Sequence, residues 1–374
     1  MENKLNSLIS IIIPFYNHLE TTKQCLTSIH KHSAENKFTN FEIFLVDDNS
    51  SEQYVFSEEE KILPLHLLRN EVNLGFAKTC NYGAKEANGK YLLFLNNDTI
   101  PLNGWLEQLL TVFKNYKDVG IAGSRLLYPD NSIQHAGVAF NSDNMPFHIY
   151  QHFPSSFPGV NQLREFQAVT GACLMIERKL FDYIGGFDEQ YLNGLEDIDL
   201  CLRVRETGKK IFYNPLSCLY HLEAQTRILD RTKQQKNVKL FLEKWHDKDL
   251  CDFREYYQKD LTNSKKLPKQ LQAVKELSNF QEIIVAIWGA GSGGRHAVEL
   301  LRFSGIKTSL FIDSDEKKWG QEILGCPIYS PNELINLKNQ GKRIFIAIAS
   351  VWFKEIEAKL MQLDFKPGLD YYSL

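Results

Sequence analysis

The segment from Tyr91 to Thr99, YLLFLNNDT, joins an apolar run to two amides and a carboxylate. The run predicts a buried strand that ends at Asn96 and Asn97, with Asp98 directly after them. In an open α/β sheet, ligands bind outside the carboxyl ends of the strands. A carboxylate at such an end suits a hard divalent cation, which prefers oxygen ligands. The pattern therefore predicts that Asp98 holds a cation able to neutralise a diphosphate.

Two other polar clusters follow predicted strands nearer the N-terminus. Pro14 and Asn17 come after the run 7–13, and Asp48 comes after the run 41–46. If the sheet is parallel, these strand ends converge on one edge. Asp48 can then accept a hydrogen bond from a nucleotide base or a ribose. The alternative is that such residues only cap the next helix or form an Asx turn.

Three carboxylates crowd together at Glu196, Asp197 and Asp199, at the start of a predicted helix over 195–206. Mutual repulsion among such acids can leave one of them suited to proton abstraction. The alternative is a structural role, because acids in the first turn of a helix are stabilised by its dipole.

His221 ends a predicted strand over 217–220. A lone histidine is most often packed in the core or merely exposed. Imidazole also suits ions such as Mn²⁺, so His221 can complete a metal shell that Asp98 begins.

The elements that must position these residues alternate between strand and helix. Strands are predicted over 7–13, 41–46, 64–68 and 91–95, with helices over 18–32 and 75–87 between them. Such alternation implies a parallel sheet with helices on both faces. Farther along, the aperiodic segment 140–163 is long enough to be a functional loop. Its Tyr150, Phe153 and Phe157 make it a candidate lid over an acceptor.

Composition excludes several classes of protein. A length of 374 residues favours two or three domains, and a net charge of −3 without a basic arm gives no sign of a nucleic-acid binder. The apolar runs are too short to span a bilayer, and the N-terminus carries no signal-peptide pattern. Seven cysteines without a Cys-x-x-Cys pair favour reduced thiols in a cytoplasmic protein.

A second glycine-rich motif lies near the C-terminus. Gly289, Gly291 and Gly294 form a G-x-G-x-x-G pattern between a predicted strand and a predicted helix, and Asp313 ends the next strand. This is the context of a dinucleotide fingerprint. The segment 281–374 is too short for both halves of a dinucleotide-binding fold. The glycines therefore either bind a nucleotide or only let helix and strand pack closely.

Taken in order, the clusters resemble the family-two inverting glycosyltransferases of the GT-A fold, in their rhamnosyltransferase-like branch. The matching pieces are SIIIPFYN at 10–17, VDDNS at 46–50, NLGFA at 73–77 with Asn81, NND at 96–98, TGA at 170–172, GFD at 186–188, EDIDLCLR at 196–203 and His221. The C-terminal segment resembles the small Rossmann-like domain of sugar acetyltransferases and some methyltransferases.

These resemblances imply an α/β protein of three parts. A GT-A domain with a mostly parallel central sheet would cover residues 1–227. A helical linker would cover 228–280, and a small Rossmann-like α/β domain would cover 281–374.

The first resemblance also implies a role for each cluster. The nucleotide sugar would be bound by Pro14, Asn17, Asp48, Gly75, Asn81 and Asn97. Asp98 would hold Mg²⁺ or Mn²⁺ with His221 as an additional ligand. Asp197 would be the catalytic base, and Glu196 would orient hydroxyl groups. Asn96 and Asn97 stand where many relatives carry a carboxylate, which leaves the metal with fewer charged ligands.

The implied function is transfer of a sugar from a nucleotide-diphosphate donor to a glycan or a lipid-linked oligosaccharide, with inversion, in bacterial surface polysaccharide synthesis. A lipid-linked acceptor would bring this cytoplasmic protein to the inner face of the membrane. One alternative is a non-catalytic scaffold that binds nucleotide sugars, suggested by the two asparagines. The other is an oxidoreductase or epimerase led by the C-terminal glycines, although no Tyr-x-x-x-Lys pair accompanies them.

Overall fold

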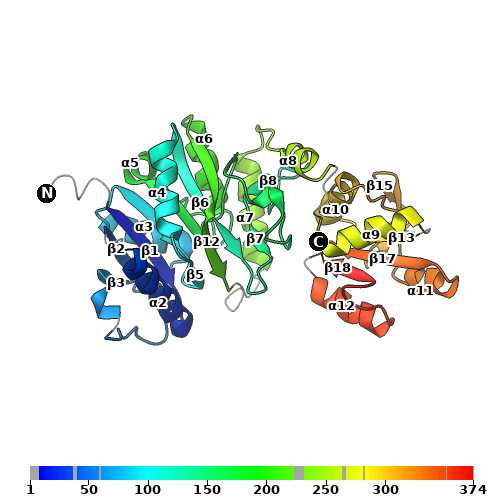
Figure 1. Ribbon diagram of the computed structural model, residues 1–374, viewed down its shortest axis with the longest axis horizontal. Helices are drawn as coiled ribbons and strands as arrows, with labels where there is room; N and C mark the ends of the chain where they lie inside the picture. The colour runs from blue at the N-terminus through cyan, green and yellow to red at the C-terminus, as the bar shows by residue number, and fades with distance from the viewer. Residues whose placement is uncertain are drawn as a thin grey trace. The chain divides into compact units, whose positions relative to one another are not determined.

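The computed structural model describes residues 8–36, 40–58, 60–222, 231–262, 267–280, 283–350 and 352–373. The chain forms two compact units (Figure 1). The first unit takes in residues 1–139, 146–151 and 160–249, and the second takes in 140–145, 152–159 and 250–374. The chain therefore enters the second unit twice, in short segments, before its final stretch.

Four parallel strands form one half of the sheet in the first unit. They are β1 (Ile9–Phe15), β2 (Phe41–Asp47), β3 (Leu65–Arg69) and β4 (Tyr91–Leu95), in the order β4-β1-β2-β3. Every residue of β1 and β4 is buried, as expected for apolar strands that are covered on both faces. Because these strands run the same way, the polar residues that follow them meet at one edge.

The other half of the sheet mixes parallel and antiparallel pairs. It is built from β5 (Thr99–Pro101), β6 (Val119–Leu127), β7 (Ile133–His135), β10 (Arg164–Phe166), β11 (Cys173–Glu177) and β12 (Lys210–His221). Strand β11 is antiparallel to both β4 and β6, and β12 is parallel to β6. Two further strands, β8 (Val138–Phe140) and β9 (Pro146–His148), form a separate two-stranded sheet.

Helices cover both faces of the first unit's sheet. They are α2 (Leu19–Asn36), α3 (Phe76–Glu86), α4 (Trp105–Asn115), α5 (Arg178–Tyr183) and α6 (Glu196–Glu206). A further helix of this unit, α7 (Arg231–Lys244), contacts α6 and the loop before it. Ile11 and Ile13 belong to the same core cluster as Leu26 of α2 and Leu109 of α4. Ile12 points to the opposite face, because side chains alternate along a strand. There α3 comes so close at Gly83 that a Cβ would lie 2.8 Å from Ile12.

The second unit is built around a six-stranded sheet. Its strands are β13 (Ile283–Trp288), β14 (Leu310–Ile312), β15 (Glu322–Ile323), β16 (Cys326–Tyr329), β17 (Arg343–Ile348) and β18 (Tyr371–Ser373), in the order β15-β16-β14-β13-β17-β18. Its helices are α8 (Phe253–Asp260), α9 (Lys269–Phe280), α10 (Ser292–Phe303), α11 (Asn332–Asn339) and α12 (Phe353–Gln362). The glycine motif joins β13 to α10.

None of the helices that the structure describes is long and apolar enough to cross a membrane.

The three aromatic residues that suggested an acceptor lid are buried. Tyr150, Phe153 and Phe157 are 2%, 3% and 1% exposed, so their rings are packed inside the protein. Phe153 and Phe157 stack edge to face with ring centroids 5.0 Å apart. These three rings are buried because packing them removes a large apolar area from water. Phe147, His148 and Gln151 of the same segment line a cavity at the carboxyl edge of the first sheet, so a lid formed by the rest of the segment stays a prediction.

Candidate active site

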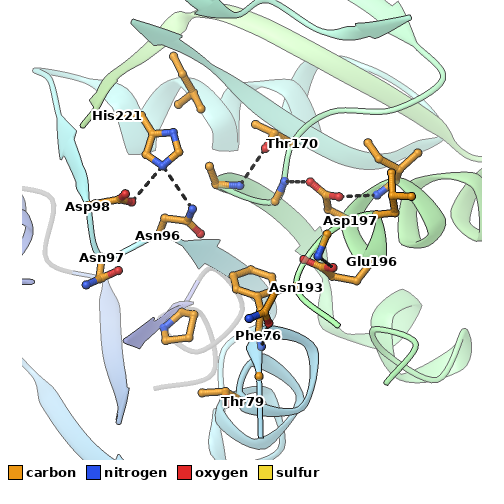
Figure 2. Close-up of a pocket in the computed structure, with 18 of the residues that line it drawn as sticks. Phe76, Thr79, Asn96, Asn97, Asp98, Thr170, Asn193, Glu196, Asp197 and His221 are labelled. Atoms are coloured by element: carbon orange, nitrogen blue, oxygen red, sulfur yellow. Dashed lines mark hydrogen bonds and ion pairs between the residues drawn. The ribbon is translucent and has the colours of Figure 1, made fainter. Parts of the chain in front are cut away.

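The carboxyl edge of the first sheet holds a cavity of ≈ 440 Å³ (Figure 2). Residues at the ends of β1, β2 and β4, at the start of α3 and at the start of α6 line it. Many of the site residues predicted from the sequence are among them: Pro14, Asp48, Gly75, Asn97, Asp98, Glu196, Asp197 and His221. The structure therefore gathers in one place residues that are more than 200 positions apart in the chain.

Asp98 and His221 come together because β5 pairs with the end of β12. This pairing sets His221 opposite Thr99, the residue after Asp98. The Nε2 atom of His221 lies 3.0 Å from Oδ1 of Asp98. Among the residues that the structure describes, no group of three or more His, Cys, Asp or Glu side chains is placed to hold a metal. Within the described residues, Asp98 and His221 are thus two candidate ligands at this point.

Gln134 determines the tautomer of His221, and therefore whether the nitrogen that faces Asp98 carries a proton or a lone pair. Its amide nitrogen donates to the carbonyl of His221 at 3.3 Å, so its amide oxygen faces the ring, 2.7 Å from Nδ1. Nδ1 must then carry the proton and donate it to Gln134. Nε2 then presents its lone pair 3.0 Å from the Asp98 carboxylate and 3.4 Å from Nδ2 of Asn96. The donor set therefore fits a divalent cation.

Asp197 and Glu196 form the opposite wall, at the start of α6 (Figure 2). The carboxylate of Asp197 accepts hydrogen bonds from the backbone N–H of Gly171 at 2.7 Å and of Ile198 at 2.9 Å. A Cβ at Gly171 would lie 3.0 Å from the Cβ of Asp197, so only glycine lets the turn approach without a shift. Glu196 accepts from the N–H of Gly194. Both carboxylates are therefore fixed in orientation.

Asp48 lines the cavity, and its carboxylate also organises a turn. Oδ1 accepts from the side chain of Asn70 at 2.8 Å and from the N–H of Leu74 at 2.7 Å, and Oδ2 accepts from the N–H of Gly75 at 2.9 Å. Gly75 has a φ of 83°, a left-handed conformation that suits glycine. Asp48 thus places Gly75 and the start of α3 against the cavity.

Asn97 contributes to the same edge, and its amide nitrogen donates to Oγ1 of Thr22 in α2 at 2.9 Å. Asn17 and Asn81 are not among the lining residues. Asn17 accepts from the N–H of Ser51 at 2.9 Å, which joins the loops that follow β1 and β2. Asn81 is bonded in both directions to the backbone of Phe187, each at 2.9 Å. Both amides hold loops in place around the cavity.

The four residues of the predicted second nucleotide site also come together, in the second unit. Gly289, Gly291 and Gly294 form the turn between β13 and α10, and a Cβ at Gly294 would lie 1.9 Å from the carbonyl oxygen of Gly289. Asp313 accepts from the N–H of Ala290 at 2.7 Å and from Nζ of Lys318 at 3.0 Å. Its carboxylate is therefore already engaged within the unit, and nucleotide binding there stays a prediction.

The charge of Asp313 follows from these contacts. Burial opposes its ionisation, but hydrogen bonds from two backbone N–H groups and the ammonium of Lys318 outweigh burial. The pKa of Asp313 therefore lies below its ordinary value.

Several cavity residues were not predicted from the sequence. Gln134, His148 and Asn193 all line the cavity. His148 lies 2.7 Å from the buried His135, between their Nδ1 atoms. Burial first, and then the neighbouring His148 and His221, hold the pKa of His135 well below its ordinary value. The sequence offered no periodic pattern for these residues; the aperiodic stretch that contains His148 was the nearest signal.

With this geometry in view, comparison with known proteins finds a family match for part of the first unit. Residues 10–185 match the family described as Glycosyl transferase family 2. These residues form a glycosyltransferase domain. Residues 282–367 match a different family, described as C2185-like, N-terminal.

The chain is also similar to curated proteins. It is 29% identical over 230 residues to the O-antigen biosynthesis protein RfbC of Myxococcus xanthus, covering 59% of this chain and 18% of that protein. It is 26% identical over 235 residues to a protein of Haemophilus influenzae named as an uncharacterized glycosyltransferase, covering 62% of this chain and 74% of that one. The chain spans less than a fifth of the length of RfbC.

A solved structure agrees with the fold. The crystal structure of GalNAc-T7 with UDP, GalNAc and Mn²⁺ has a TM-score of 0.52 and 16% identity, covering 80% of this chain and 55% of that one. At this identity the likeness concerns the fold, and it confirms the predicted GT-A architecture of the glycosyltransferase domain. The prediction of a glycosyltransferase is confirmed as well. The rhamnosyltransferase-like branch stays a prediction.

Proposed function

We propose that this chain transfers a sugar from a nucleotide-diphosphate donor to a hydroxyl group of a glycan or a lipid-linked oligosaccharide, with inversion, in bacterial surface polysaccharide synthesis. The observation that carries the proposal is one cavity with Asp98 and His221 on one wall and Asp197 on the other (Figure 2). The likeness to a protein named for O-antigen biosynthesis supports the polysaccharide context.

The charge of the cavity supports a requirement for a divalent cation. Four carboxylates line it, those of Asp48, Asp98, Glu196 and Asp197, and no described lining residue is Lys or Arg. Two like charges about 4 Å apart repel by about 4 kcal/mol at an effective dielectric constant of about 20. A diphosphate entering this cavity therefore needs a counter-ion. Asp98 and His221 would hold Mg²⁺ or Mn²⁺, which would neutralise charge that develops on the departing nucleoside diphosphate.

Asp197 would act as the base. As the acceptor oxygen forms its bond to C1 of the sugar, the bond from C1 to the diphosphate oxygen breaks, and the proton of the hydroxyl passes to the Asp197 carboxylate. Attack from the face opposite the leaving group inverts the anomeric centre. The N–H groups of Gly171 and Ile198 hold the carboxylate in one orientation, as a positioned base requires. Glu196 would orient hydroxyl groups beside it.

The nucleotide would lie across the ends of β1 and β2. Pro14 and Gly75 line this part of the cavity, and Asp48 holds the turn that leads into α3. Asn17 and Asn81 would act on the donor indirectly, because each fixes a loop and neither lines the cavity.

A panel of nucleotide sugars tests the proposal. The purified chain is incubated with each donor with and without Mn²⁺, and thermal stabilisation and release of the nucleoside diphosphate are measured. We expect one donor class to stabilise the chain and to be consumed only with the cation present. Stabilisation without any release in the wild-type chain, with a range of glycan acceptors, would favour the non-catalytic scaffold instead.

A further inference from the structure

Helix α7 lies in the segment 228–280 that the sequence predicts to be a linker, yet it packs as part of the first unit. One side of the helix is buried. Asn237, Phe241 and, just past its end, Trp245 are 3%, 0% and 5% exposed, and they follow a spacing of four residues. Residues so spaced share a face of a helix. A buried asparagine on such a face must find hydrogen-bond partners.

The partners of Asn237 are all in the loop that precedes α6. Its Oδ1 accepts from the N–H of Leu192 at 2.9 Å, and its Nδ2 donates to the carbonyl of Leu192 at 3.2 Å and to that of Gly194 at 2.8 Å. Only a side-chain amide offers an acceptor and a two-hydrogen donor on one short stem. Asn237 therefore recognises the backbone of this loop in both directions.

The loop needs such a partner because its backbone is strained. Asn193, Gly194 and Leu195 have φ values of 58°, 139° and 73°, so three successive residues are left-handed. Asparagine and glycine enter this region readily, but leucine adopts it only where its surroundings impose it. The same loop carries the cavity residues Asn193 and Gly194 and leads directly into Glu196.

The C-terminal end of α7 is anchored to α6 as well. Asp199 of α6 is fully buried, and it is contacted by Nζ of Lys244 at 2.8 Å and by Nε1 of Trp245 at 3.1 Å. Arg203 approaches the same carboxylate at 2.7 Å. The position of α7 against the loop and against α6 is thus fixed at two separate points.

We propose that α7 is a working part of the glycosyltransferase domain and that Asn237 is a positioning residue for the reaction. It does not line the cavity. By holding residues 193–195 in their left-handed conformation, it sets where Asn193, Glu196 and Asp197 stand against the donor sugar. This inference rests on the proposed function for the reaction it serves, but the conformation of the loop is measurable without any turnover.

Asn237→Ala tests the proposal, with Phe241→Leu as its matched control. Both substitutions remove buried contacts on one face of α7, but only the first removes hydrogen bonds to the loop. Lys239→Ala, on the exposed side of the same helix, is the control for any change in α7. Thermal unfolding of each variant sets an assay temperature at which all of them are folded.

We expect three results for Asn237→Ala in the full-length chain. The amides of residues 192–195 exchange hydrogen at least tenfold faster than in Phe241→Leu. For the donor identified by the panel, kcat falls about 10- to 100-fold per folded molecule, because small misplacements of reacting groups cost this much. Binding of the nucleoside diphosphate product alone, measured as its Kd, stays within about threefold of wild type.

Equal exchange rates at 192–195 in Asn237→Ala and Phe241→Leu would overturn the proposal, as would equal kcat values. A wild-type chain that turns over no donor would overturn the proposed function and not this one, provided that the loop exchanges faster only in Asn237→Ala. Hydrogen exchange therefore tests the role of Asn237 in the loop, and donor turnover by the wild-type chain tests the proposed function, so that either can fail without the other.

Discussion

Replacing Asp197 with asparagine removes the proposed base with the smallest change of shape. The carboxylate accepts one N–H from Gly171 and one from Ile198. Asparagine keeps one accepting oxygen, so one of these two N–H groups loses its partner. Such a loss costs about 1–3 kcal/mol when the group is buried. Since Asp197 is half-buried, we expect a loss of about 1 kcal/mol in the free energy of unfolding.

Turnover should fall much further than stability. A positioned general base contributes about 10²- to 10⁴-fold to the rate. At 1.36 kcal/mol for each factor of ten, this corresponds to about 2.7–5.4 kcal/mol in the activation barrier. The increase in the activation barrier is thus several times the decrease in the free energy of unfolding, and both quantities are measurable on the same sample.

Release of the nucleoside diphosphate at saturating donor and acceptor measures kcat. Thermal unfolding with and without donor measures stability and donor binding. Asp182→Asn is the matched control, because Asp182 is an exposed carboxylate outside the cavity. Donor should still stabilise Asp197→Asn, since the cation site and the nucleotide side are unchanged. A variant that binds donor normally and keeps kcat within tenfold of wild type would refute the assignment of Asp197 as the base.

Three further outcomes are expected from the geometry. His221→Ala should raise the Mn²⁺ concentration for half-maximal activity at least tenfold, since it removes one of two ligands; an unchanged Mn²⁺ titration would contradict the ligand role. Gly171→Ala should lower kcat several-fold with little effect on the KM for donor, because the added Cβ would lie 3.0 Å from that of Asp197; unchanged steady-state kinetics would show that the turn tolerates it. Asp313 is ionised more easily in the folded state than in the unfolded one, so its contribution to stability is present above its ordinary pKa of 3.8 and is lost as the pH falls through the folded value. Asp313→Asn should therefore be less stable than wild type near neutral pH, with a gap in unfolding free energy that closes in acid; a constant gap in denaturant titrations would oppose this.

The strand ends of the site were predictable because each follows a mostly apolar run. The runs before Pro14, Asp48 and Asp98 mark buried parallel strands, and parallel strands bring the residues at their carboxyl ends to one edge of the sheet. The pairing of Asp98 with His221 was proposed from the preference of such ions for imidazole and from the family resemblance. Its physical basis, the β5–β12 ladder, joins residues too far apart in sequence for a local pattern to reveal.

The features that were not predicted from the sequence depend on which groups a side chain hydrogen-bonds or packs against. Nothing in the type or spacing of Asn17 and Asn81 shows that their amides would bind backbone instead of lining the cavity. The buried face of α7 is likewise hidden, because the lysines around Asn237 give the segment the composition of a solvated linker. The burial of Phe153 and Phe157, proposed as part of an acceptor lid, was not predictable either, because an aperiodic loop gives no sign of the groups that pack against it.

The pairing of β12 with β6 is irregular between Asn214 and Cys218, only a few residues before His221. Side chains along a strand alternate between faces, so deleting a single residue in that interval would turn His221 away from Asp98. The stretch that identifies the family ends at residue 185 and would be untouched. A descendant with such a deletion would keep its match to the family and lose one of the two proposed metal ligands. The loss of a single codon can therefore remove the proposed metal site while the fold is still inherited.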